Sequence, residues 1–138
     1  IRLAKRIGKA IPLNSAKVFV AGIAFKGVPE TDDTRDSPTI ALIDELEKCG
    51  ATLFGYDPAV NPEQISELGL TPMETLDAGL SICDVCVFMT NHREFTELRV
   101  DDLIQCLPTG AIVVDGWGIF EPDECESRGI RHIGVGVG

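Results

Sequence analysis

The sequence predicts an α/β fold in which a mostly parallel β-sheet lies between two layers of helices. Apolar runs rich in β-branched residues alternate with amphipathic segments along the chain, the pattern of successive βα units. The first run, residues 17–24, is almost continuously apolar, as expected for a strand buried on both faces. Right-handed crossovers then give a Rossmann-like three-layer sandwich with a sheet of about five strands.

The helix after the first strand is expected to begin at Ser37-Pro38, because serine is a good N-cap and proline fits the first helical turn. Cys49-Gly50 ends it, since glycine is common just past a helix. Asn61-Pro62 and Thr71-Pro72 predict two more helix starts in the same way. The later elements are expected at 51–56 (strand), 62–69 and 72–79 (helices), 84–89 (strand), 92–106 (one helix or two), 111–115 (strand), 121–128 (helix) and 130–135 (strand).

The N-terminal segment differs from the rest of the chain, since residues 1–17 hold five bases and no acid. Its bases alternate with apolar residues at roughly helical spacing. We expect residues 1–16 to form a helix that connects a preceding domain of a longer protein to the domain formed by 17–138. A contact with a membrane surface or another polyanion is the alternative.

Composition excludes several classes of partner. A chain of 138 residues is the size of one domain, and 44% hydrophobic with 25% charged residues is typical of a soluble globular protein. The net charge of −10 argues against general nucleic-acid binding, which needs a basic face. No apolar stretch approaches the roughly 18–20 residues that cross a bilayer, and no signal-peptide pattern is present. We therefore expect neither a nucleic-acid nor a membrane partner.

The chain has five cysteines, and two of them form the C-x-x-C of Cys83 and Cys86. Positions three apart on a strand point to opposite faces, so this pair is not expected to share a metal ion or a disulfide. No second pair has metal-ligand spacing. Buried structural thiols are predicted, and they suit a reducing compartment such as the cytoplasm.

The segment from 18 to 38, VFVAGIAFKGVPETDDTRDSP, holds the candidate binding residues. Lys26 lies just beyond the first strand, where open parallel sheets bind ligands, and its ammonium suits a phosphate or a sugar carboxylate. A surface lysine paired with Glu30 or Asp32 fits its position equally well. Arg35 precedes the helix start, so its planar fork can clamp a pyrophosphate or pair with the neighbouring aspartates.

Two other polar residues follow predicted strands. Asp57 closes the second strand, where dinucleotide folds often keep an acid for a ribose hydroxyl, but the G-x-G-x-x-G pattern is missing and Pro58 favours a turn. His92 follows the third strand and either orients a ligand or has a structural role near a helix N-cap.

The segment from 18 to 38 resembles the G-x-A-F-K…D-D-x-R-x-S-P stretch that opens the C-terminal domain of the UDP-glucose/GDP-mannose dehydrogenase family. Similar pieces follow in the family's order. The resemblance implies that Lys26 contacts a UDP-sugar, that Phe25 contacts its sugar end, and that Arg35 reaches a dinucleotide held by another domain. The further pieces are Tyr56-Asp57-Pro58, CDVCVFMTNHREF at 83–95, VVDGWGIF at 113–120 and the closing GIRHIGVGVG.

The resemblance implies an NAD-dependent UDP-sugar 6-dehydrogenase, which oxidises the sugar C6 alcohol to a carboxylate in two hydride transfers. A cysteine carries a thiohemiacetal between the two steps in that family. It belongs to a preceding part of the chain, and none of the five cysteines here fits its motif. The chain is therefore expected to bind a UDP-sugar without turning it over, and to work with preceding domains that hold most of the NAD, in a homo-oligomer. The piece around His92 is similar to the branch acting on UDP-N-acetylhexosamines.

Trp117 is the main departure from the family, which commonly has an arginine or lysine at or beside this place. The indole either stacks on a base or sugar face, as a substrate-binding residue, or covers the core. Two other functions are open: a free-standing Rossmann-like nucleotide-binding or regulatory module, and a structural assembly domain. A reading frame that continues upstream into a G-x-G-x-x-G domain distinguishes the enzyme from both.

Overall fold

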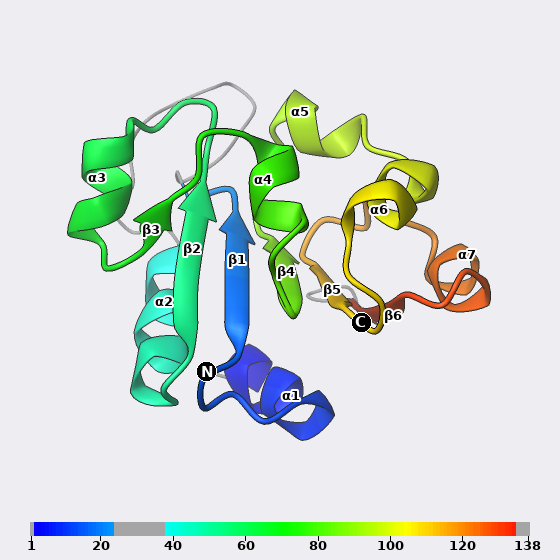
Figure 1. Ribbon diagram of the computed structural model, residues 1–138, viewed down its shortest axis with the longest axis horizontal. Coiled ribbons are helices and arrows are strands. Elements are labelled where there is room, and N and C mark those ends of the chain that lie inside the picture. The colour runs from blue at the N-terminus through cyan, green and yellow to red at the C-terminus, as the bar shows by residue number, and fades with distance from the viewer. Residues whose placement is uncertain (1, 24–37, 135–138) are drawn as a thin grey trace.

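The computed structural model describes residues 2–23 and 38–134, and within these ranges the sheet has six strands, all parallel (Figure 1). Their order across the sheet is β3-β2-β1-β4-β5-β6. The predicted α/β fold and parallel sheet are confirmed, with one strand more than the expected five. The strands are β1 (Lys17–Ala21), β2 (Thr52–Tyr56), β3 (Thr71–Pro72), β4 (Val85–Phe88), β5 (Ile112–Asp115) and β6 (Arg131–Gly134).

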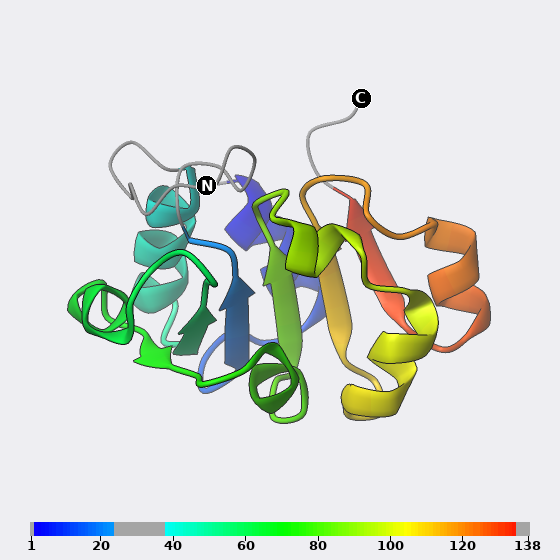
Figure 2. The same ribbon diagram turned by 90° about the horizontal axis from the view of Figure 1, so that it is seen from above.

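Helices cover both faces of the sheet, which gives three layers (Figure 2). One face packs against α1, α2 and α3, and the other against α4, α5, α6 and α7. Within the described ranges, no helix has the length and apolar character needed to cross a bilayer. The helices are α1 (Arg2–Ala10), α2 (Pro38–Lys48), α3 (Pro62–Glu67), α4 (Leu76–Leu80), α5 (Arg93–Thr96), α6 (Val100–Cys106) and α7 (Pro122–Ser127).

The side chains of β1 contribute to two separate hydrophobic cores, one on each face of the sheet. These side chains alternate between faces, as the period of two in a strand requires. Val18 and Val20 belong to the core cluster under α1 and α2, whereas Phe19 and Ala21 belong to the cluster under α4 to α7. All four are 0% exposed, so β1 is buried on both faces as the continuous apolar run predicts.

The N-terminal helix α1 packs on this domain. Ala4 and Ile7 on its apolar face are buried in the same core cluster as α2. At its C-terminal end, Nη2 of Arg131 donates a hydrogen bond to the carbonyl oxygen of Ala10 at 3.1 Å. The basic residues Lys5, Arg6 and Lys9 are exposed. The connection of this helix to a preceding domain stays a prediction.

The predicted helix over 72–79 is wrong at its start. Thr71 and Pro72 form the edge strand β3 instead, paired with Phe54 and Gly55 of β2. Proline is tolerated on an edge strand because no further strand needs its missing N–H. Helix α4 begins later, after the N-cap Thr75, whose Oγ1 accepts a hydrogen bond from the backbone N–H of Ala78 at 3.1 Å.

Candidate functional site

The candidate site is the carboxyl edge of the sheet at the junction of β1 and β4. The chain winds from β1 through β2 to β3 in one direction and from β4 through β5 to β6 in the other. Open parallel sheets bind ligands beyond the carboxyl ends of the strands at such a reversal. Of the residues predicted to form a site, Phe25, Lys26 and Arg35 lie outside the described residues, and Trp117 lies within them.

Asp57 fixes the chain where it leaves β1. Its Oδ2 accepts a hydrogen bond of 2.7 Å from the backbone N–H of Ile23, and its Oδ1 accepts one of 2.8 Å from that of Ala59. The side chain is nearly buried, at 6% exposed. Both carboxylate oxygens thus accept hydrogen bonds from the backbone, which confirms the turn-forming interpretation of Asp57.

A polar pair lies beside the end of β2. The hydroxyl of Tyr56 donates a hydrogen bond of 2.7 Å to Oε1 of Glu94, at the start of α5. Burial, and then this contact with Glu94, raise the pKa of Tyr56 well above its ordinary value. His92 is the N-cap of α5, with Nδ1 accepting a hydrogen bond of 3.1 Å from the N–H of Glu94. This contact gives His92 a structural role at the helix start.

Asp115, the last residue of β5, organises the loop that carries Trp117. Its Oδ1 accepts hydrogen bonds from the backbone N–H of Trp117 (3.1 Å) and of Ile119 (3.0 Å), and its Oδ2 accepts one from that of Phe120 (2.8 Å). Nε2 of His132 lies 3.3 Å from the same Oδ2. Asp115 is 1% exposed. This buried carboxylate is therefore the hydrogen-bonding centre of the whole loop.

The pKa of Asp115 reflects two opposing effects. Burial raises it, because an ionised carboxylate is less stable away from water. The hydrogen bonds from Phe120, Ile119 and Trp117, with the contact to His132, favour the ionised form and outweigh burial, so the pKa is lowered. The loop is thus built around a charged carboxylate.

Trp117 bridges the loops that follow β4 and β5. Its indole Nε1 donates a hydrogen bond of 3.0 Å to the carbonyl oxygen of Met89. The residue is 51% exposed, so the indole does not cover the core. Half of its surface is available for contact at the carboxyl edge, and the hydrogen bond fixes where the ring lies. The stacking role of Trp117 stays a prediction.

The C-x-x-C pair differs from the expected geometry. Cys83 precedes β4 instead of lying in it, so the alternation of strand side chains does not separate it from Cys86. Both belong to the same core cluster, and burial, and then a hydrogen bond with Cys83, raise the pKa of Cys86 well above its ordinary value. The argument from opposite faces was wrong. The predicted burial of both thiols is confirmed, because Cys83 and Cys86 are 0% exposed.

No group of His, Cys, Asp or Glu side chains suited to a metal ion occurs among residues 2–23 and 38–134.

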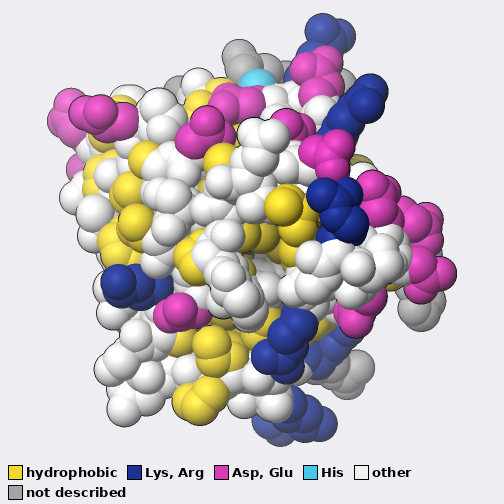
Figure 3. Space-filling model, turned by 45° about the vertical axis from the view of Figure 1, so that its right-hand side comes forward, with side chains coloured by type: hydrophobic (Ala, Val, Ile, Leu, Met, Phe, Trp, Pro, Cys, Tyr) yellow, Lys and Arg dark blue, Asp and Glu magenta, His cyan; other side chains and the backbone are white. Residues whose placement is uncertain are grey.

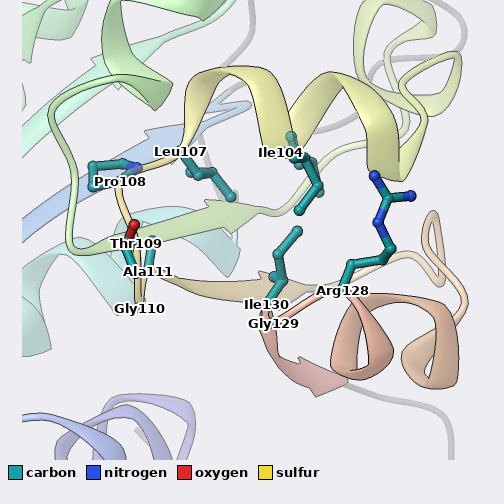
Figure 4. A pocket seen from close by; sticks show the side chains of 10 residues that line it. Ile104, Leu107, Pro108, Thr109, Gly110, Ala111, Arg128, Gly129 and Ile130 are labelled. Carbon is teal, nitrogen blue, oxygen red and sulfur yellow. The ribbon is translucent and has the colours of Figure 1, made fainter.

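A hollow of about 260 Å³ lies at the amino edge of the sheet, opposite the candidate site. There Ile104 of α6 and Ile130 point towards each other (Figure 4). Nη1 of Arg128, which also lines the hollow, pairs with Oδ1 of Asp101 at 2.8 Å. The side of the molecule with α6 and α7 shows hydrophobic side chains in small groups and not as one broad patch (Figure 3).

Two residues of the carboxyl edge, Asp115 and Thr90, were not predicted from the sequence as site residues. Asp115 stood within the motif VVDGWGIF without an assigned role, and its signal was an acid directly after a buried strand. Thr90 lies two residues beyond the end of β4 and is 1% exposed. A single threonine carries no pattern that separates a site residue from any other, so sequence alone could not select it.

Comparison with known proteins identifies one family. The model of the UDP-binding domain of the UDP-glucose/GDP-mannose dehydrogenase family matches residues 19–122. A UDP-glucose 6-dehydrogenase of Rhizobium meliloti is 34% identical over 126 residues, covering 90% of this chain and 28% of that protein. A UDP-N-acetyl-D-mannosamine dehydrogenase of Methanococcus maripaludis is 31% identical over 133 residues, covering 94% of this chain and 29% of that protein.

Solved structures agree with this result. An NDP-N-acetyl-D-galactosaminuronic acid dehydrogenase of Methanosarcina mazei superposes with a TM-score of 0.77 at 25% identity, covering 97% of this chain and 27% of that one. A UDP-glucose dehydrogenase of Pyrobaculum islandicum superposes with a TM-score of 0.71 at 26% identity, covering 97% of this chain and 28% of that one. The chain thus spans less than a third of the length of each of these proteins.

Proposed function

We propose, on the premise that the chain belongs to the UDP-glucose/GDP-mannose dehydrogenase family, that it is the UDP-sugar-binding part of an NAD-dependent UDP-sugar 6-dehydrogenase. The observation that carries this proposal is the match of residues 19–122 to the family's UDP-binding domain. The reaction oxidises the C6 alcohol of the sugar to a carboxylate. Its two steps each need a hydride acceptor, and NAD supplies that chemistry.

This domain contributes binding and orientation. Lys26 holds the substrate, Phe25 contacts its sugar end, and Trp117 offers an exposed indole face to the base or the sugar. Enclosing the sugar between domains excludes water from the reaction. The uronic acid product suits the synthesis of polysaccharides, and the free cysteines suit an enzyme of the cytoplasm.

NAD does not fit this domain in the manner of a dinucleotide-binding fold. Such folds keep an acid at the end of the second strand for the ribose hydroxyls. The residue in that place is Asp57, and its two oxygens already accept hydrogen bonds from the N–H groups of Ile23 and Ala59 in the turn after the strand. We therefore assign the cofactor to a preceding domain of a homo-oligomeric enzyme, with Arg35 reaching towards it.

Lys26→Ala is expected to weaken UDP binding by the full-length protein about tenfold or more, because a hydrogen bond to a charged group is lost. Isothermal titration with UDP, UDP-N-acetylglucosamine and GDP-mannose measures the loss. Lys17→Ala is the matched control, since Lys17 is an exposed lysine at the opposite end of β1. Equal affinity in the wild type and Lys26→Ala would remove Lys26 from the site. A wild type that binds no UDP would contradict the proposed function.

A further inference from the structure

Thr90 has an unsatisfied hydroxyl in an unusual place. The residue is 1% exposed, and among the described residues its Oγ1 has no hydrogen-bond partner. A buried polar group without a partner costs free energy, so buried hydroxyls in folded proteins almost always have one. The missing partner needs an explanation, and the position of Thr90 offers one.

Thr90 lies where the winding of the sheet reverses. It follows Met89 just beyond the carboxyl end of β4 and adjoins Gly22, just beyond the end of β1. Gly22 has a φ of +98°, and a Cβ atom added to it would overlap Oγ1 of Thr90. The residue in this position therefore has to be glycine, which places the hydroxyl against bare backbone at the junction of β1 and β4. Anionic ligands of open parallel sheets bind at this junction.

The backbone beside Thr90 is fixed from two sides. The N–H of Met89 donates a hydrogen bond of 3.3 Å to the carbonyl oxygen of Ala21 in β1. The carbonyl oxygen of Met89 accepts the 3.0 Å hydrogen bond from Nε1 of Trp117. Threonine is also restricted in χ1 by its branched Cβ. The hydroxyl is thus held in place and has little freedom to turn towards a partner elsewhere in the protein.

We propose that the hydroxyl of Thr90 donates a hydrogen bond to a diphosphate oxygen of the nucleotide sugar, and so is a positioning residue for the substrate. This inference rests on the proposed function. A hydroxyl donates a short, strong hydrogen bond to an anionic oxygen, and glycine at position 22 lets the Thr90 side chain lie directly against the backbone at the end of β1. Trp117 is close to Thr90, because its indole Nε1 donates a hydrogen bond to the carbonyl oxygen of Met89, the residue before Thr90. A nucleotide whose phosphates contact Thr90 can therefore place its base or sugar against Trp117.

Thr90→Val tests the proposal, because valine keeps the shape of the side chain and removes only the hydroxyl. The variant of the full-length protein is expected to bind UDP about tenfold more weakly, as befits the loss of a hydrogen bond to a charged group. Without ligand, its unfolding midpoint is expected to equal or exceed that of the wild type, since an unpartnered buried hydroxyl has been removed. Thr90→Ser keeps the hydroxyl and is expected to bind within about threefold of the wild type.

Truncated ligands identify the group that Thr90 contacts. Titration with UDP, UMP and uridine is expected to show the loss in Thr90→Val for UDP and none for uridine. An equal loss for uridine would overturn the assignment to a phosphate oxygen. Unchanged UDP affinity in Thr90→Val would overturn the proposal itself, and a lowered midpoint without ligand would too, by showing that the hydroxyl already has a partner. A wild type that fails to bind UDP would instead contradict the proposed function.

Discussion

Gly79→Ala is expected to destabilise the domain, although alanine is the better helix former. Gly79 lies in α4, directly over the aromatic ring of Phe19 in β1. A Cβ atom at Gly79 would overlap three atoms of that ring, and Phe19 is 0% exposed, so the ring has no space into which it can move. Overpacking of this kind costs about 1–3 kcal/mol or more, and the gain in helix propensity is about 1 kcal/mol. Because three ring atoms would be overlapped, the cost is expected at the upper end of that range, which leaves a net loss of about 1–2 kcal/mol.

Gly8→Ala is the matched control, because Gly8 is also helical, in α1, but exposed. A Cβ atom there would meet Leu13 Cδ1 at 3.5 Å, an ordinary van der Waals distance. The same substitution should therefore stabilise the domain by about 0.5–1 kcal/mol. Hydrogen exchange of the full-length protein in a urea series measures both changes on peptides from β1 and α4. Two changes of the same sign would contradict this account of the core.

Asp115→Ala is expected to have the largest effect on the loop that carries Trp117. The substitution removes the acceptor of three backbone N–H groups, of which that of Phe120 is buried. Unsatisfied buried donors cost about 1–3 kcal/mol each, and exposed ones can bind water, so a loss on the order of 3 kcal/mol is expected. The loop should also release Trp117, the only tryptophan in the chain, which predicts faster hydrogen exchange at 116–120 and weaker UDP binding.

Asp84→Ala is the control for Asp115→Ala, since Asp84 is exposed and its Oδ2 accepts one backbone hydrogen bond, from Lys17. It should cost about 1 kcal/mol or less. Equal losses in the two variants would contradict the central role of Asp115.

The pH dependence of Asp115→Asn tests whether the loop needs the charge. The folded pKa of Asp115 lies below its ordinary value of 3.8, so the unfolded chain takes up the proton first as the pH falls. The stability that the carboxylate contributes is therefore complete above about pH 5 and is lost as the pH falls through the folded pKa. The difference in unfolding midpoint between the wild type and Asp115→Asn should be constant above pH 5 and narrow below about pH 4. A difference that stays constant down to pH 3 would contradict the charged loop.

Three similar X-Pro signals show how far the sequence predicts this fold. Helices α2 and α3 begin at Pro38 and Pro62, as predicted, whereas Thr71-Pro72 forms an edge strand. Proline suits both a first helical turn and an unpaired strand edge, so the local pattern does not decide between them. Tertiary contact does: the N–H of Met73 donates a hydrogen bond of 2.8 Å to the carbonyl oxygen of Gly55, which draws the segment onto β2.

In the candidate site too, the sequence predicts some features and leaves others undetermined. Trp117 was predicted because it replaces an expected cation in a motif, and the carboxyl edge was predicted from the βα pattern. The hydrogen bond between Trp117 and Met89 joins residues 28 apart in the sequence, and the contact of Asp115 with His132 joins residues 17 apart. Neither pairing has a local pattern, because strand order alone brings these residues together. Only the three-dimensional arrangement could reveal them.

The most direct test of the account is hydrogen exchange of the full-length protein with and without UDP. The central claim is that this domain binds the nucleotide at the carboxyl edge of its sheet, where β1 and β4 meet. UDP is therefore expected to slow exchange in peptides that cover residues 22–23, 89–92 and 115–120. Unchanged exchange in those peptides, or slower exchange only around the hollow at the amino edge near Thr109 and Ile130, would contradict it.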